Sequence, residues 1–153
     1  MTDRDIVQTL IEETQALLAA DTDLLAIVKN PGEDVGVLRF HHVWAPPNCT
    51  FPYMTAEVTL RPIGTEDGYQ EGELRVDVWD ASPTSLRMLA MRKRVLGLLN
   101  RRIINADECA ARVGQGGDFD LSQPEVEVWR RSIGWPLRVY PTAEIADTQA
   151  AQA

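Results

Sequence analysis

The chain has 153 residues, 44% hydrophobic and 25% charged, which suits one globular domain with a modest core rather than two domains. Its formal net charge of −8 disfavours a primary role in coating nucleic acid, because an acidic protein repels phosphate on average. No apolar run is long enough to span a membrane, and the acidic N-terminus lacks the charged-then-apolar order of a signal peptide.

The N-terminal part of the chain is predicted to be helical. Over residues 3–19, apolar side chains recur at helical spacing with polar residues opposite them. A shorter helix is expected over 21–29, with Asp21 as its N-cap, because the Asn-Pro-Gly of 30–32 ends it. Beyond this point the period of the pattern changes from helical to extended.

The next part of the chain is predicted to form strands. Residues 35–43 are expected to be a first strand, followed by a proline-broken loop at 44–52. Residues 53–60 and 73–80 alternate apolar and polar side chains, which predicts an antiparallel hairpin with a long tip over 61–72. The faces predicted to be buried hold Met54, Ala56, Val58 and Leu60 on one strand and Leu74, Val76 and Val78 on the other.

Residues 82–100 give the strongest helix prediction. Ser82 is a suitable N-cap, Pro83 suits the first turn, and Asn100 is a plausible end. The segment 84–106 contains no acidic residue, so this helix is basic on an acidic protein. Its cations therefore need partners elsewhere.

Three arginines form one stripe of this helix. Arg87, Arg94 and Arg101 are seven residues apart, and at helical spacing they fall on one side, whereas Arg92 points into the apolar arc. Two interpretations stay open: the arginines pair with acidic residues of the same chain, or they form a subunit interface, where arginine is enriched.

The C-terminal part is predicted to be mostly extended. A short strand is expected at 109–113, a flexible glycine loop at 114–124, and two closing strands at 125–133 and 137–140. The tail over 141–153 is low in large apolar residues and is expected to be disordered.

This order of elements implies an α+β fold. Residues 1–140 are expected to form a single domain, with a mostly antiparallel sheet and the N-terminal and central helices packed on it. The loops at 44–52, 61–72 and 114–123 are candidate contacts with other subunits or partners, because loops of this length in a small domain are often functional.

Asp77 and Asp80 flank Trp79 and could suggest an acid–base pair. Side chains alternate along a strand, so the two carboxylates are expected on opposite faces, which argues against a shared proton or a shared metal. Asp77 is expected on the polar face with Glu73 and Arg75, and Asp80 at the end of the strand near the next helix.

A zinc site has little support. His41, His42, Cys49 and Cys109 are enough residues for four ligands, but they lack the spacing that such sites use, and the cysteines are expected to be reduced thiols. No metal or cofactor is therefore expected. The alternative from another class is a small enzyme or metal-binding protein whose site assembles from His41 or His42, Cys49 and Asp77.

The tryptophans divide into two groups. Core positions are the default for Trp79 and Trp129. Trp44 and Trp135 lie next to prolines, so they are candidates for exposed contact positions at an interface with a subunit or partner.

The order of elements resembles a known family of structural proteins. The residues that carry the resemblance are "AADTDLLAIVKN", the strand opening "FPYMTAEV", the strand "GELRVDVWD" that runs into a helix, and the ending "DFDLSQPEVEVWRRSIGWPLRVY". Over roughly residues 5–140 the chain is similar to the tail terminator, or tail completion, proteins of long-tailed bacteriophages. It departs from them in a longer stretch between the second predicted helix and Phe51.

The resemblance implies a structural virion protein rather than an enzyme. Such proteins have an α+β fold and no cofactor, form rings that are usually of six subunits, cap the tail tube, and join it to the head connector or stopper protein. The expected place is the virion neck, after assembly in the host cytoplasm, with DNA passing through the lumen without specific binding and with no contact to a membrane. An acidic lumen would suit this passage.

Overall fold

The computed structural model describes residues 3–61, 68–107 and 109–141. The predicted disorder of the C-terminal tail beyond residue 141 and half of the predicted 61–72 tip lie outside these ranges. No helix of the described part is long and apolar enough to cross a membrane. The described elements are α1 (Asp3–Ala19), α2 (Thr22–Val28), β1 (Phe40–His42), β2 (Tyr53–Leu60), β3 (Gln70–Ala81), α3 (Leu86–Leu99), β4 (Ile103–Asn105), β5 (Cys109–Val113), β6 (Gly117–Asp120), the 3-10 turn η1 (Pro124–Val126) and β7 (Val128–Pro141).

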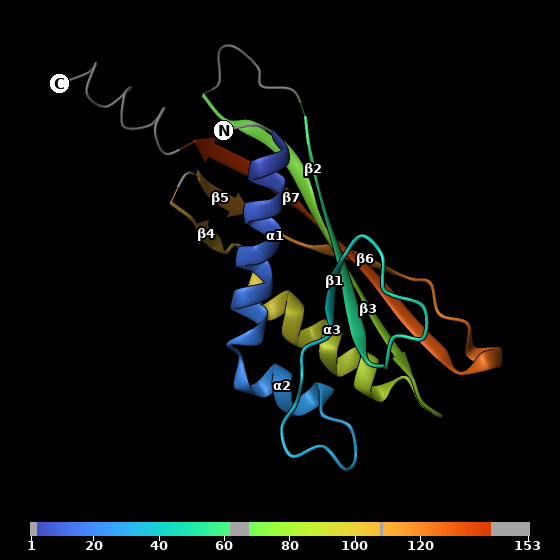
Figure 1. The fold of residues 1–153 in the computed structure, drawn as a ribbon. Coiled ribbons are helices and arrows are strands. Elements are labelled where there is room, and N and C mark those ends of the chain that lie inside the picture. Colours follow the sequence, from blue (N-terminus) through green and yellow to red (C-terminus); the bar gives the residue numbers. More distant parts are fainter. Residues whose placement is uncertain (1–2, 62–67, 108, 142–153) are drawn as a thin grey trace.

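The strands form one twisted sheet with the helices on one side of it (Figure 1). The strand order is β1-β2-β3-β7-β5-β4, and β6 pairs with β7 beyond the end of β5. All pairings are antiparallel except that between β1 and β2. The predicted α+β class, with a mostly antiparallel sheet and the N-terminal and central helices packed on it, is confirmed.

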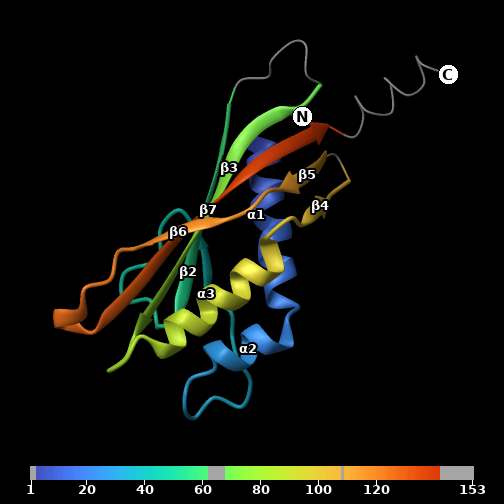
Figure 2. The same cartoon turned by 180° about the vertical axis from the view of Figure 1, so that it is seen from behind.

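Alternation along the strands separates a core face from an open face. On β2 and β3 the predicted buried residues face each other in register, for example Ala56 opposite Val76, and both are almost inaccessible to solvent. The helices supply the other half of the core, with Leu10 of α1 and Met91 of α3 buried against the sheet. In the part of the chain that the structure describes, no α-helix packs on the opposite face of the sheet, which remains available for a binding site (Figure 2).

Three elements up to the central helix differ in their bounds from the prediction, and one of them is β3, which begins at Gln70 rather than at residue 73. The predicted strand at 35–43 shrinks to the three residues of β1, which pair in parallel with the start of β2. The central helix begins after Ser85 rather than Ser82. Ser82 does not cap it because Ser82 lies in a bend before the helix, where its hydroxyl donates to the Thr84 carbonyl at 2.5 Å and its carbonyl accepts a hydrogen bond from the Trp129 indole at 2.8 Å.

The C-terminal part differs more. The predicted closing strands at 125–133 and 137–140 are one continuous strand, β7, and the predicted glycine loop contains β6. Pro136 does not interrupt β7, because its carbonyl accepts from the Gly114 N–H at 2.9 Å and its nitrogen therefore faces the same side, in the gap between β5 and β6. No neighbouring strand needs the missing hydrogen there.

Candidate functional site

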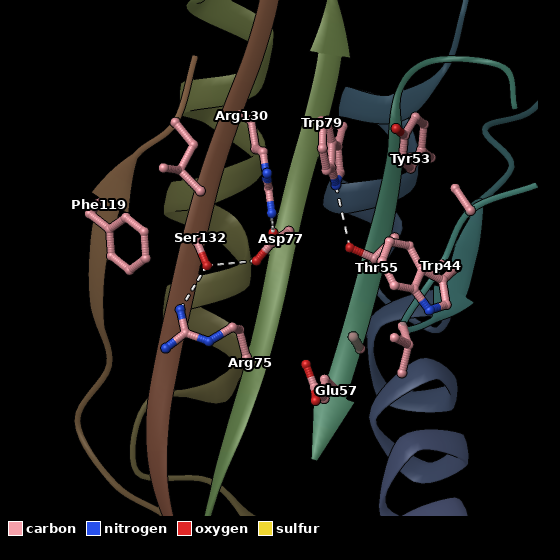
Figure 3. A pocket seen from close by; sticks show the side chains of 14 residues that line it. Trp44, Tyr53, Thr55, Glu57, Arg75, Asp77, Trp79, Phe119, Arg130 and Ser132 are labelled. Carbon is pink, nitrogen blue, oxygen red and sulfur yellow. Dashed lines mark hydrogen bonds and ion pairs between the residues drawn. The ribbon is translucent and has the colours of Figure 1, made fainter. Parts of the chain in front are cut away.

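A groove lies on the open face of the sheet, opposite the helices (Figure 3). It has a volume of about 580 Å³ and crosses β2, β3 and β7, with the segment after β1 on one side and β6 on the other. The lining includes Trp44, Tyr53, Thr55, Glu57, Arg75, Asp77, Trp79, Phe119, Arg130 and Ser132. Strand alternation places these side chains together, because Thr55, Asp77 and Ser132 are register partners across three adjacent strands.

A hydrogen-bonded polar network forms the floor of the groove. Asp77 is buried, and its carboxylate accepts from the Ser132 hydroxyl at 2.7 Å and from the Arg130 Nε at 2.9 Å. Arg75 donates to the Ser132 hydroxyl at 2.7 Å and to the Glu73 carboxylate at 2.6 Å. A buried carboxylate needs such partners, since an unpaired one would carry a large desolvation penalty. The network is therefore a rigid, satisfied floor.

Aromatic rings form the other half of the lining. Trp79 stacks on Tyr53 at a ring distance of 5.4 Å, and the Arg130 guanidinium lies 4.2 Å from the Trp79 ring centre. Burial is the largest cause that raises the pKa of Tyr53, so the phenol stays neutral. At the rim, Trp44 is 82% exposed and Phe119 is 50% exposed. Exposed aromatic rings around a rigid polar floor suit the binding of a protein surface.

The network does not form an acid–base site in the described structure. Both carboxylate oxygens of Asp77 are engaged, and Ser132 has Asp77 and Arg75 as its partners rather than a histidine. The alternation that separates Asp77 from Asp80 is confirmed: Asp77 lies on the open face, whereas Asp80 lies on the helix side and pairs with Arg87 of α3.

Among the residues named for an enzyme or metal site, the structure brings one pair, Cys49 and His41, into contact. The Cys49 Sγ lies 3.3 Å from the His41 Nε2, so the structure does bring these two residues together. His42 is exposed, and Asp77 is engaged by Arg130 and Ser132. Within the described residues, no group of three or more His, Cys, Asp or Glu side chains could hold a metal ion.

Comparison with known proteins finds a similar fold. No family model matches the chain, and no curated protein matches it. A chain in a solved structure described as the virion of a native gene transfer agent (GTA) particle matches with a TM-score of 0.64. The match has 13% sequence identity and covers 85% of this chain and 93% of that chain. This chain therefore shares its fold with a chain of that particle.

The structure pairs two of the predicted interface arginines within the chain. Arg87 donates two hydrogen bonds to the fully buried Asp80, at 2.7 and 3.0 Å, and one to the Asn30 amide oxygen at 2.8 Å. Arg94 donates to both carboxylate oxygens of Asp21, at 2.6 and 2.7 Å. These contacts favour the intramolecular interpretation of both arginines over a subunit interface.

The remaining basic residues of this segment have different surroundings. Arg92 binds Asp118 of β6, and this hydrogen bond is the largest cause that lowers the pKa of the Asp118 carboxyl. Arg101 lies beyond the end of α3 and is exposed, with a positive φ of 58°. Arg101 remains a candidate contact residue. Because α3 ends at Leu99, Arg101 does not continue the helical stripe of Arg87 and Arg94.

The two tryptophans proposed as contacts have opposite outcomes. Trp44 is exposed at the rim of the groove, as expected. The exposure expected for Trp135 is wrong, because Trp135 is a fully buried residue on the core face of β7, and its indole donates to the Asn100 amide oxygen at 2.8 Å. The flanking proline suggested a loop, but the strand continues through Pro136.

Sequence reasoning missed several residues of the groove. Arg130, Ser132 and Phe119 belong to β7 and β6, and their place beside Asp77 depends on long-range register. The available signal was the period-two pattern of residues 128–133, which puts Arg130 and Ser132 on one face of a strand. The pattern does not specify which strand this face adjoins.

Proposed function

We propose that the chain is a structural protein of a phage-like virion that forms a ring, caps the tail tube, and joins it to the head connector. The observation that carries the proposal is the fold shared with a chain of a gene transfer agent virion, over nearly the whole length of both chains. The resemblance of the sequence to tail terminator proteins supports the more specific role. A ring of six copies at the virion neck, assembled in the host cytoplasm, is the expected form.

The open-face groove supports this role through its chemistry. Its exposed aromatic rim and its rigid ion-paired floor fit a protein partner, either a neighbouring copy or the tail tube and connector proteins. The net charge of −8 suits a ring through which DNA passes without binding. The proposed mechanism is mechanical closure of a tube rather than chemistry on a substrate.

Assembly with purified tails tests the proposal. The purified protein, alone and with tail tubes, is examined by native mass measurement and electron microscopy. We expect a closed ring, alone or at the end of the tube, and we expect that tails with the ring join to heads while tails without it do not. A chain that stays monomeric at all concentrations and leaves tube ends bare would refute the proposal.

A further inference from the structure

Some basic residues of the chain form ion pairs with acidic residues of the same chain, and others do not. Most arginines form ion pairs within the chain, and this holds on both faces of the sheet. Four of the exceptions lie at one end of the sheet, on or beside β4, β5 and β7. Among the described side chains, the basic residues outside any ion pair are Lys29, Lys93, Arg101, Arg102, Arg112 and Arg138.

We call this surface the arginine edge, formed by Arg101, Arg102, Ile103, Arg112 and Arg138; it extends from the edge strand β4 across β5 to the inner strand β7. Arg112 of β5 lies directly opposite Arg138 of β7, and both are exposed. On the other side of β5, Arg112 lies opposite Ile103 of β4, which is 54% exposed. The like charges of Arg112 and Arg138 oppose each other in register, and only Arg138 has compensation, from Glu71 on its other side and from the Tyr69 ring at 5.0 Å. An anionic partner surface would replace the repulsion between Arg112 and Arg138 with attraction to both arginines.

The hairpin between β6 and β7 has the complementary composition. We call it the acidic tip, formed by Asp120, Glu125, Val126 and Glu127, all of them exposed. Val126 is 59% exposed, and the segment 119–129 contains no basic residue. The turn is well held, because the Glu127 N–H donates to the Pro124 carbonyl at 3.1 Å and the Ser82 N–H donates to the Glu127 carbonyl at 3.3 Å. The tip is therefore preorganised for docking.

The two surfaces lie at opposite ends of the molecule. In Figure 1 the β4–β5 edge is at the upper left and the tip at the lower right, and Figure 2 shows the same separation from behind. Each surface combines an exposed aliphatic side chain with charges mainly of one sign, although Glu71 lies opposite Arg138 and Arg131 lies opposite Asp120. This is the apolar centre and charged rim of a protein interface. Two different complementary surfaces make a head-to-tail contact, which closes into a ring when the rotation allows it.

We propose that the arginine edge of one copy binds the acidic tip of the next copy. This inference rests on the proposed ring-forming function and names the surfaces that build the ring. A second copy is favoured over nucleic acid as the occupant, because the chain itself carries a preorganised acidic and apolar counterpart, and because its overall charge is −8.

Complementary charge reversal tests the contact. One double variant is Arg112→Glu with Arg138→Glu, and the other is Glu125→Arg with Glu127→Arg. Alone, each variant opposes like charges at every contact, so we expect the dissociation constant of self-association to rise about tenfold or more. In an equimolar mixture, every edge can meet a tip of opposite charge in an alternating ring. We expect the mixture to restore assembly in sedimentation velocity experiments.

Controls separate the possible failures. Lys29→Glu with Lys93→Glu makes the same charge change at unpaired positions away from the edge, and it should leave assembly unchanged; circular dichroism confirms that all variants fold.

If both edge and tip variants assemble like the wild type, or if folded variants stay apart when mixed, this contact is wrong and the ring uses another surface. If the edge variant assembles normally but loses binding to a labelled DNA duplex, the edge serves nucleic acid and the proposal is overturned. If the wild type forms no ring even with tails, the proposed function itself fails.

Discussion

Asn100 connects the end of the central helix to the buried tryptophan of the last strand. It is the C-cap of α3, as predicted, and its amide oxygen accepts from the Trp135 indole at 2.8 Å and from the Gly116 backbone at 2.9 Å. A β-carbon at Gly116 would lie 2.4 Å from the Trp135 Nε1. The glycine is thus required for close packing on the indole rather than for flexibility.

Gly116→Ala is therefore expected to destabilise the protein. The added methyl group has to displace a fully buried indole that is fixed by a hydrogen bond, so we expect a loss of about 1–3 kcal/mol in the free energy of unfolding. Urea denaturation followed by tryptophan fluorescence measures it. The adjacent Gly117→Ala is the matched control, because a β-carbon there meets nothing within 4 Å. Equal stability of the two variants would contradict the packing role.

Individual residues were predictable where the determining interaction is local. Asp21 caps α2 through a 2.9 Å hydrogen bond from the Leu24 N–H, and a cap of this kind is readable from three neighbouring residues. Trp135 was not, because its burial depends on α3 and on Gly116, which lie far from it in the sequence. A neighbouring proline indicates a loop only when its missing N–H would leave a partner unsatisfied.

At the scale of elements, the central helix is fixed to its neighbours by arginine–aspartate pairs. Arg87 binds the end of β3, Arg94 binds the N-cap of α2, and Arg92 binds β6. A helix with no acidic residue of its own thus obtains its counter-charges from three different elements. These pairs add directional contacts to the apolar packing of Met91 and Val95.

The pair between Arg92 and Asp118 predicts a pH dependence of stability. The folded-state pKa of Asp118 is lowered below its ordinary value of 3.8, chiefly by the hydrogen bond from Arg92. Its contribution is therefore present above pH 3.8 and is lost as the pH falls through the lower folded pKa. Arg92→Gln should lower the melting temperature at pH 7 by about 3–6 °C. We expect the difference from the wild type to shrink as the pH falls below 3.8.

Scanning calorimetry across this pH range measures the effect. Lys93→Gln is the control, because Lys93 is exposed on the same helix and forms no ion pair within the described structure. A constant difference between Arg92→Gln and the wild type at all pH values would mean that the Asp118 carboxylate is not the group involved.

The sequence prediction is accurate where the determining interactions are close in the sequence and fails where they join distant segments. Helices α1 and α2 and the antiparallel pairing of β2 with β3 were predictable from local periodicity and from the closeness of the two strands in the sequence. Strand β6 and the continuity of β7 were not, because both depend on pairing with segments elsewhere in the chain. The groove has the same origin: the sequence placed Asp77 on the open face correctly, but its partners Arg130 and Ser132 come from β7.

At the scale of the whole molecule, replacing the exposed tryptophan at the groove rim should affect partner binding without affecting the stability of the fold. Trp44 is 82% exposed, so Trp44→Ser should leave the free energy of unfolding within about 0.5 kcal/mol of the wild type. If the groove receives a protein partner, the same change should weaken ring assembly or tail-tube binding about tenfold or more.

Val35→Ser is the control for this variant. Val35 is 70% exposed but does not line the groove, so its replacement removes a comparable exposed apolar group without affecting the binding surface. Sedimentation and tube-binding assays compare the two variants. Wild-type assembly and tube binding by Trp44→Ser would exclude the groove rim as a contact.

The central position of β7 also determines when the molecule can fold. The ribosome synthesises β7 after every other described strand, yet β7 is the strand that joins β3 on one side to β5 and β6 on the other. Until it emerges, the two parts of the sheet remain unjoined, with open hydrogen-bonding edges on β3 and β5 that are prone to pair with other chains. Completion of the sheet is therefore a late event dominated by long-range contacts, and chaperone protection matters most just before residues 128–141 leave the exit tunnel.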